Sequence, residues 1–263
     1  MKQLFMAGAV CAAIAAPASA LAQATAAAAP ASPHTVTGNM AIVSDYRFRG
    51  ISQTGNDPAI QGGIDYSHES GFYLGNWNSS ITSDSFTNAA GIEMDFYGGF
   101  KFPVGDITVD IGALYYYYPD AKTGVGREEY NTLEAYLGLS YGPVTFKVWY
   151  ALTDWFGVNE DSGYEDDTDG SIYYELNASF PIAEGWTLIG HAGYQDVHGI
   201  DDYDGEGDLN YFDWKIGVAY DWNGWALGAA IVGTDNPNDS FYVVDGDDDI
   251  DETTVVFSIS KTF

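Results

Sequence analysis

Cysteine, long apolar runs and basic residues are all scarce in this sequence. The only cysteine, Cys11, lies in an N-terminal segment that resembles a secretory signal peptide, so disulfides and thiol chemistry are excluded from the mature chain. No other run of about 18 apolar residues occurs, which excludes an inner-membrane protein built from helices. The 9 Lys and Arg stand against 38 Asp and Glu, and this acidity argues against nucleic acid or anionic lipid as a ligand.

The N-terminal segment has the parts of a signal peptide. Lys2 precedes an apolar stretch over residues 4–16, and overlapping small-residue cleavage motifs follow. Residues after the motifs are rich in Ala and Pro and show no periodicity. We therefore expect a signal peptide over 1–22 with cleavage between 20 and 24, a flexible periplasmic lead-in over 23–35, and a folded unit over 36–263.

The folded unit alternates apolar and polar residues with a period of two. In one segment Ile92 and Phe96 fall on one face, while Glu93 and Asp95 fall on the other. A strand places successive side chains on opposite faces, so each segment predicts a strand with one apolar and one polar surface. The expected strands are 37–48, 58–67, 71–81, 90–103, 106–118, 130–141, 143–154, 171–181, 185–196, 209–222, 224–234 and 252–263.

Loop lengths and aromatic content identify the kind of sheet. Tight turns follow the even-numbered strands, including Asn223-Gly224, and long polar loops follow the odd-numbered ones. Aromatic residues reach 16%, which favours a membrane barrel with aromatic girdles over a soluble β-sandwich or lectin-like fold. We expect an all-β protein of the bacterial outer membrane: a transmembrane antiparallel up-and-down β-barrel of about 12 strands with a periplasmic N-terminus.

The last expected strand keeps Val255, Phe257, Ile259 and the terminal Phe263 in one register. It resembles the C-terminal strand by which outer-membrane proteins are recognised, which makes the barrel-assembly machinery an expected partner. The alternative is an ordinary closing strand that happens to end in Phe.

Two stretches carry a family resemblance. Residues 44–52 read SDYRFRGIS, and residues 58–77 read PAIQGGIDYSHESGFYLGNW. Together they resemble the start of the TorF family of porin-like proteins from Gram-negative bacteria, over about the first third of the mature chain. The resemblance implies an outer-membrane porin. It implies little about the solute and brings no catalytic motif.

Charged residues of the strands are expected to face the lumen, because a basic residue on the lipid face costs about 2–4 kcal/mol at mid-bilayer. A lumen with more acids than bases favours cations. The alternative is that the charges pair, for example Glu93 or Asp95 with Arg47 or Lys147, and plug the barrel. The expected pore-lining residues are Asp45, Arg47, Arg49, Glu93, Asp95, Asp110, Glu134, Lys147, Glu175, Asp213 and Lys215.

Two finer assignments follow from the strand registers. Arg47 and Arg49 are two apart on the first strand, so they would point the same way and form either a positive wall or a pair of lumenal salt bridges. The strand at 71–81 is ambiguous, and Tyr73, Trp77 and Ile81 are the expected outer-face residues.

The outer loops carry acidic clusters. Residues 202–208, DYDGEGD, resemble a calcium loop but fail the full EF-hand pattern at two positions. Calcium or magnesium could bridge such loops to each other or to lipopolysaccharide, and the alternative is a solvated acidic rim. We therefore expect no metal site and no cofactor.

The four histidines give little support for an enzyme. His191 is expected to point inward and His198 lies in an acidic loop, but no nucleophile accompanies either in the sequence. The predicted function is an outer-membrane porin, weakly cation-preferring, for passive diffusion of small hydrophilic solutes. The second hypothesis is a non-conducting surface barrel whose acidic loops bind divalent cations, lipopolysaccharide or a partner.

Overall fold

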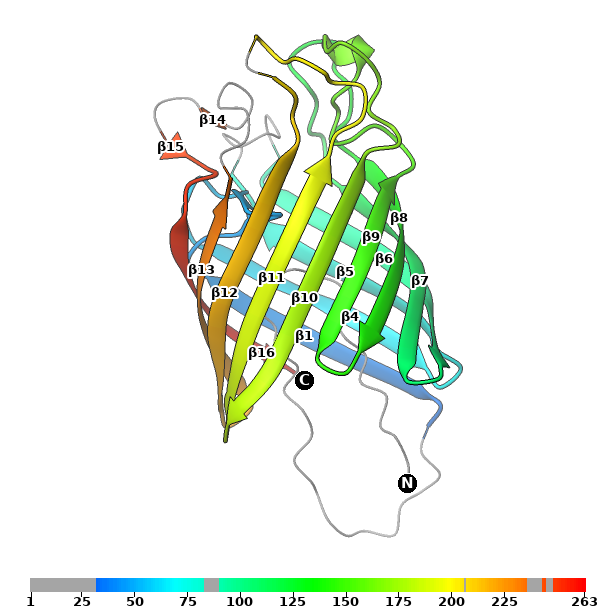
Figure 1. Cartoon of the computed structure of the whole chain (residues 1–263), viewed down its shortest axis with the longest axis vertical. Coiled ribbons are helices and arrows are strands. Elements are labelled where there is room, and N and C mark those ends of the chain that lie inside the picture. The colour runs from blue at the N-terminus through cyan, green and yellow to red at the C-terminus, as the bar shows by residue number, and fades with distance from the viewer. Residues whose placement is uncertain (1–31, 83–89, 206, 236–242, 245–247) are drawn as a thin grey trace.

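The computed structural model describes residues 32–82, 90–205, 207–235, 243–244 and 248–263, and the expected signal peptide lies outside these residues. Twelve antiparallel strands form a closed barrel (Figure 1). The barrel strands are β1 (His34–Val43), β4 (Ala59–His68), β5 (Phe72–Ser80), β6 (Ile92–Val104), β7 (Ile107–Tyr117), β8 (Thr132–Tyr141), β9 (Val144–Ala151), β10 (Ile172–Ala183), β11 (Trp186–Asp196), β12 (Tyr211–Trp222), β13 (Trp225–Thr234) and β16 (Thr254–Thr262).

Smaller elements lie between the barrel strands. Two short hairpins occur, one of β2 (Arg47–Phe48) with β3 (Ile51–Ser52) and one of β14 (Val243–Val244) with β15 (Asp248–Asp249). A single 3₁₀ turn, η1 (Glu160–Ser162), lies in an outer loop. Among the described residues, no helix is long and apolar enough to cross a bilayer.

The alternation of turn and loop lengths is confirmed. The turns that follow β4, β6, β8, β10 and β12 are short, and at one of them Asn223 and Gly224 both have positive φ, as a type I′ hairpin requires. The long connections gather at the opposite end of the barrel (Figure 1). All twelve predicted strands overlap observed ones, and most of their ends agree within two or three residues.

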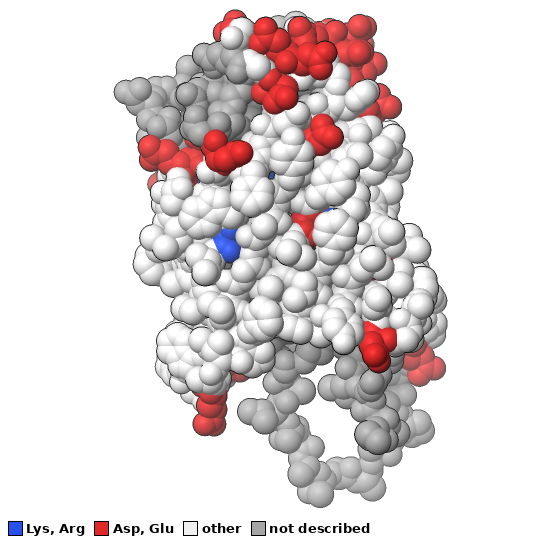
Figure 2. All heavy atoms as spheres, in the orientation of Figure 1, with Lys and Arg blue, Asp and Glu red and all other residues white. Residues whose placement is uncertain are grey.

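The outside of the barrel is apolar. Exposed large side chains occur at alternate positions on every wall strand, as at Ile60, Phe96, Leu137 and Ile216. Figure 2 shows a middle that is mostly uncharged on this face, with one basic and one acidic patch, and Asp and Glu gathered at the end that bears the long loops. This distribution matches a barrel whose middle faces lipid.

Strand β5 has the opposite orientation to the one predicted. Tyr73, Trp77 and Ile81 are buried inside, while Phe72 and Leu74 are exposed outside. The prediction failed because Tyr and Trp suit either face of a barrel. The correct register turns two asparagines outward, where Asn78 Nδ2 donates to Asn76 Oδ1 at 2.7 Å and so satisfies part of their polar surface internally.

The first barrel strand ends earlier than predicted. β1 stops at Val43 rather than continuing to residue 48, and residues 44–57 fold into the barrel with the β2–β3 hairpin at their centre. We call residues 44–57 the lumenal hairpin. It places Arg47 and Arg49 inside the barrel, away from the wall on which the sequence pattern would have put them.

The outer loops form a second apolar core. Side chains from loops 152–171, 197–210 and 250–253 pack together with Ile51 at the tip of the lumenal hairpin. The buried members include Ile51, Trp155, Val158, Ile200, Leu209 and Ile250. These loops therefore cover the outer side of the hairpin.

The barrel closes through a short seam. β1 and β16 pair at five positions, Asn39–Val43 with Ser258–Thr262, whereas β1 and β4 pair at ten. Three further backbone bonds extend the seam, two between Gly38 and Phe263 and one from the Ser44 N–H to the Phe257 carbonyl. Every other pair of neighbouring wall strands has at least seven pairs.

Candidate functional site: the lumenal hairpin

The base of the lumenal hairpin is closed by Asp45. Its carboxylate accepts hydrogen bonds from the Ser52 hydroxyl at 2.6 Å and from the Thr54 hydroxyl at 3.2 Å. The Thr54 hydroxyl oxygen also accepts from the backbone N–H of Tyr46 at 3.1 Å. A small hydroxyl residue at each of these positions lets the chain turn inward with its polar groups paired.

The tip of the hairpin is a two-residue turn. β2 and β3 pair Phe48 with Ile51, so Arg49 and Gly50 form the turn, and their φ angles are 47° and 85°. Positive φ at both positions is the type I′ conformation, which favours Asn-Gly. Arginine at the first position carries local backbone strain, and its side-chain contacts compensate for that strain.

Arg49 ties the hairpin to the far wall. One guanidinium nitrogen donates to the Glu134 carboxylate on β8 at 2.6 Å, and another donates to Gln195 Oε1 on β11 at 2.7 Å. The guanidinium also lies 4.2 Å from the ring centroid of Tyr173 on β10. Since β8 to β11 lie opposite β1 in the closed strand order, these contacts span the lumen.

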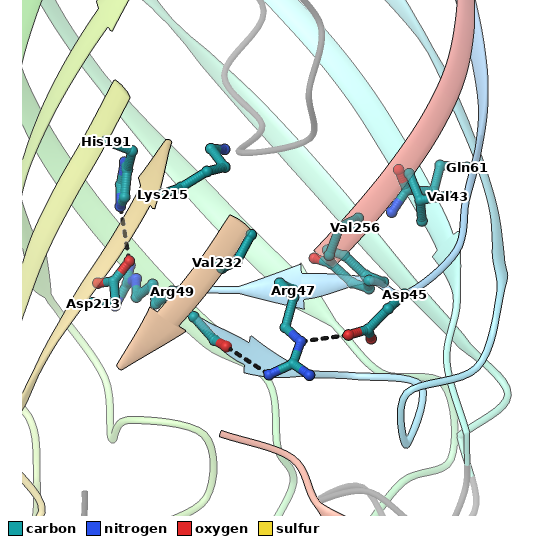
Figure 3. A pocket seen from close by; sticks show the side chains of 12 residues that line it. Val43, Asp45, Arg47, Arg49, Gln61, His191, Asp213, Lys215, Val232 and Val256 are labelled. Atoms are coloured by element: carbon teal, nitrogen blue, oxygen red, sulfur yellow. Dashed lines mark hydrogen bonds and ion pairs between the residues drawn. The ribbon is translucent and has the colours of Figure 1, made fainter. Parts of the chain in front are cut away.

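Arg47 holds the near side of the hairpin. Its guanidinium pairs with Asp45 and donates to the backbone carbonyls of Gly50 at 3.1 Å and Ile250 at 2.6 Å (Figure 3). Asn56 Oδ1 accepts a further bond at 2.5 Å. The side chain therefore joins both arms of the hairpin to the chain that leads into β16. It is buried.

The space beside the hairpin is small. A cavity of about 40 Å³ is lined by hairpin residues Asp45, Arg47 and Arg49 and by wall residues that include His191 and Lys215 (Figure 3). It could hold about three water molecules. The hairpin and its contacts therefore occupy space inside the lumen at this level.

Tyrosine hydroxyls are the main partners of the lumenal carboxylates. Glu93 accepts from Tyr46 at 2.8 Å and from Tyr118 at 3.1 Å, and no ion pair connects it to Arg47 or Lys147. Glu93 therefore does not make the ion pair given as an example of the alternative. Four other lumenal carboxylates also accept from tyrosine: Asp65 from Tyr97, Asp110 from Tyr73, Glu134 from Tyr116 and Asp213 from Tyr173.

The wall lysines form looser contacts. Lys101 Nζ and Lys147 Nζ each lie 3.8 Å from the same Asp110 oxygen. Lys147 Nζ also lies over the rings of Tyr136 and Trp149 at 4.5 and 4.8 Å. Two lysines thus share one carboxylate and rest on aromatic faces.

His191 joins the lumenal network on β11. Its Nε2 lies 2.8 Å from Asp213 Oδ1 and its Nδ1 lies 2.8 Å from Asn177 Oδ1. The register places Lys215 directly across from it. The Tyr173 hydroxyl also lies 3.0 Å from His191 Nε2, so the described partners of this ring are a carboxylate, an amide oxygen and a phenol.

Comparison with known proteins gives the family. The family model described as "Bacterial protein of unknown function (Gcw_chp)" matches residues 27–263. The chain belongs to this family. This family description does not use the name TorF, so the resemblance to the TorF family stays a prediction. No curated protein matches the sequence.

Solved porin structures share the fold of this Gcw_chp chain. A KdgM porin in complex with disordered oligogalacturonate is 7% identical, and the match covers 87% of this chain and 98% of that chain with a TM-score of 0.50. A second KdgM porin structure gives the same values. OccAB3 of Acinetobacter baumannii is 10% identical over 88% of this chain and 65% of its own, with a TM-score of 0.44.

The expected pore-lining residues of the Gcw_chp barrel all lie inside it. Eight of them come from the wall as predicted, and their side chains are buried or half-buried. Asp45, Arg47 and Arg49 come from the hairpin instead, and the two arginines reach different sides of the lumen. Of the two alternatives for these arginines, the structure has the pair of lumenal salt bridges.

Sequence reasoning missed several partners of these residues. Ser52 and Thr54 close the hairpin, and Gln195 binds its tip. The spacing of Ser52 and Thr54 after Asp45 was a visible turn signal, whereas Gln195 had none. Among the described residues, no group of three or more His, Cys, Asp or Glu could hold a metal ion.

Proposed function

We propose that this protein is an outer-membrane channel for passive diffusion of small hydrophilic solutes, and that the lumenal hairpin closes it. The observation that carries the proposal is the contact of Arg49 with Glu134 and Gln195, because it holds a chain segment across the lumen. The hairpin is held across the lumen by side-chain bonds of Arg49, and such bonds can break without unfolding the strands of the barrel wall. In this proposal the hairpin therefore acts as a gate.

The wall supports a channel. Its exterior is apolar, and its interior carries charged and hydroxyl groups on most strands. The fold is shared with KdgM porins over 98% of their chains. We propose that the chain lies in the outer membrane among lipids and lipopolysaccharide, that the barrel-assembly machinery inserts it through β16, and that it is not an enzyme.

A weak cation preference is part of the proposal. Lumenal acids outnumber lumenal bases, and several carboxylates are held by neutral tyrosines rather than by cations. Where such carboxylates are ionised, no directly bound cation neutralises them, and their charge favours a passing cation. The acidic outer loops add a negative potential at the mouth.

A single-channel recording tests the gate. We compare the refolded protein with the double variant Arg49→Asn/Glu134→Gln in a planar bilayer under a potassium chloride gradient. Asn-Gly keeps the type I′ turn, and Gln leaves no unpaired buried charge. The variant is expected to show larger or longer openings of cation sign. Lys122→Asn/Glu129→Gln, an exposed loop pair 3.7 Å apart, is the matched control.

Two outcomes contradict the gate. If the double variant conducts like the wild type, Arg49 does not hold a gate. If both proteins are silent although a gel shows heat-modifiable folded barrels, the barrel is not a channel.

The second candidate function is a non-conducting surface barrel. It is favoured by the same filled lumen and by the apolar core that the outer loops build above it. In this case the loops would bind lipopolysaccharide, divalent cations or a partner. A calcium-dependent rise in melting temperature together with a silent bilayer would support it over the channel.

A further inference from the structure

Two histidines face each other at the periplasmic rim, far from the lumenal hairpin. His34 opens β1, His68 ends β4, and the two are direct cross-strand partners. Their ring centroids are 5.0 Å apart. Both fall on the same side of the sheet as exposed Val36 and Ile64, and His34 is itself exposed. The proposed channel makes no use of either side chain.

Each ring has an oxygen partner at Nδ1. His34 Nδ1 lies 2.8 Å from the Tyr66 hydroxyl, and His68 Nδ1 lies 2.8 Å from the Ser70 hydroxyl. If each Nδ1–H donates to that oxygen, the lone pair of each Nε2 is available. The Ser70 backbone N lies 3.1 Å from His68 Nδ1, and its N–H favours the tautomer in which Nδ1 accepts and Nε2 carries the proton. A ligand at Nε2 must therefore shift His68 to the tautomer with the proton on Nδ1.

The ring separation suits one bound metal ion. A zinc–nitrogen bond of about 2.0–2.1 Å places the metal about 3.2 Å from each ring centroid. Ligand angles between square-planar and tetrahedral then separate the centroids by about 4.5 to 5.2 Å. The observed 5.0 Å lies inside this interval.

We propose that His34 and His68 bind a divalent transition-metal ion, with water filling the remaining positions. Imidazole nitrogens select zinc, nickel or copper over calcium and magnesium. Tyr66 and Ser70 are the residues that orient the two rings, as partners of metal-bound histidines commonly do. No cluster of three ligands occurs in the described part of the chain, so the ion is exchangeable. It joins β1 to β4 at the rim.

Calorimetric titration of the refolded, untagged protein with zinc chloride tests the site, and nickel chloride repeats the test. One site per chain is expected for the wild type. His34→Ala and His68→Ala should each weaken binding at least tenfold, and Tyr66→Phe should weaken it less. His198→Ala, in an outer loop, is the matched control and should leave binding unchanged.

A second readout separates binding from folding. Zinc should raise the melting temperature of the wild type and of His198→Ala, but not that of His34→Ala/His68→Ala, and a gel should show all three as folded barrels. The proposal is overturned if zinc binds the wild type and the double variant equally. Absence of any zinc binding to the wild type would overturn it as well.

Discussion

Two sets of basic side chains occupy the same lumen and are held in different ways. Arg47 and Arg49 come from the hairpin and make direct bonds of 2.6–2.7 Å to carbonyl and carboxylate oxygens on the surrounding chain. Lys101 and Lys147 come from the wall, and both lie 3.8 Å from one shared aspartate. The arginines fix the position of a segment, whereas the lysines only line a surface.

This difference follows from the chemistry of the two groups. A guanidinium presents several N–H donors in a plane, so a single arginine can bind two strands and an aromatic face at once. A lysine ammonium is a compact point charge on a flexible chain. Removing a hairpin arginine should therefore change which parts of the lumen are occupied, while removing a wall lysine should change only its charge.

The largest effect is expected from a substitution at the tip of the lumenal hairpin. A Cβ at Gly50 would lie 2.7 Å from Thr234 Cγ2 and 2.8 Å from Asp213 Cβ. Gly50→Ala should displace the tip, lower the free energy of unfolding by about 1–3 kcal/mol and increase conductance. Gly224→Ala, where φ is also positive but nothing lies within 4 Å, is the control. Equal losses in both variants would assign the effect to backbone strain alone.

Replacing two lumenal carboxylates by amides tests their contribution to cation preference. Glu93→Gln/Asp95→Asn should shift the reversal potential under a potassium chloride gradient toward zero, because the lumen loses two negative charges. Both residues are buried in the barrel. Glu160→Gln/Asp161→Asn, in an outer loop, should produce a smaller shift. An unchanged reversal potential in the lumenal variant would remove these residues from the selectivity of the pore.

A wall lysine sharpens the comparison. Lys147→Met keeps most of the apolar stem of the side chain but removes its charge and the Nζ that lies over Tyr136 and Trp149. Cation preference should rise modestly, and the melting temperature should change little. Lys122→Met on an exposed loop is the reference. A melting temperature that falls as far as in Gly50→Ala would mean that the lysines tether the structure as the arginines do.

The smallest effect concerns the tyrosines. Tyr97→Phe removes the hydroxyl that donates to Asp65 and should cost about 1 kcal/mol. Thermal unfolding in detergent measures it, with Tyr141→Phe on the exposed outer face as control. A loss no larger than that of the control would show that water replaces this hydroxyl without penalty.

The wall was predictable from the sequence and the hairpin was not. Each wall strand repeats its alternation over about ten residues, and the loop lengths supplied an independent check. Residues 44–49 continue the same alternation past Val43, so the alternation itself does not end the strand there. The inward turn depends on Arg49 meeting Glu134, which lies 85 residues later in the chain. A periodic pattern contains no information about such a contact.

The orientation of β5 failed for a related reason. Tyr73 and Trp77 are apolar enough for lipid and polar enough for the lumen, so period alone did not orient the strand. Its register was set by neighbours on both sides and by the Tyr73 hydroxyl, which donates to Asp110. In barrels rich in tyrosine and tryptophan, the apolar–polar alternation is therefore a weaker guide to which face of a strand points inward.

The short seam between β1 and β16 has a consequence for how the cylinder is completed. It joins the two ends of the described sheet through five paired positions, the two bonds between Gly38 and Phe263 and the bond from Ser44 to Phe257. Each of these strands is an exposed edge until the other arrives, so closure is the step at which the whole chain must already be in register. Hydrogen exchange in the finished barrel should be fastest along this line, where the fewest bonds must open.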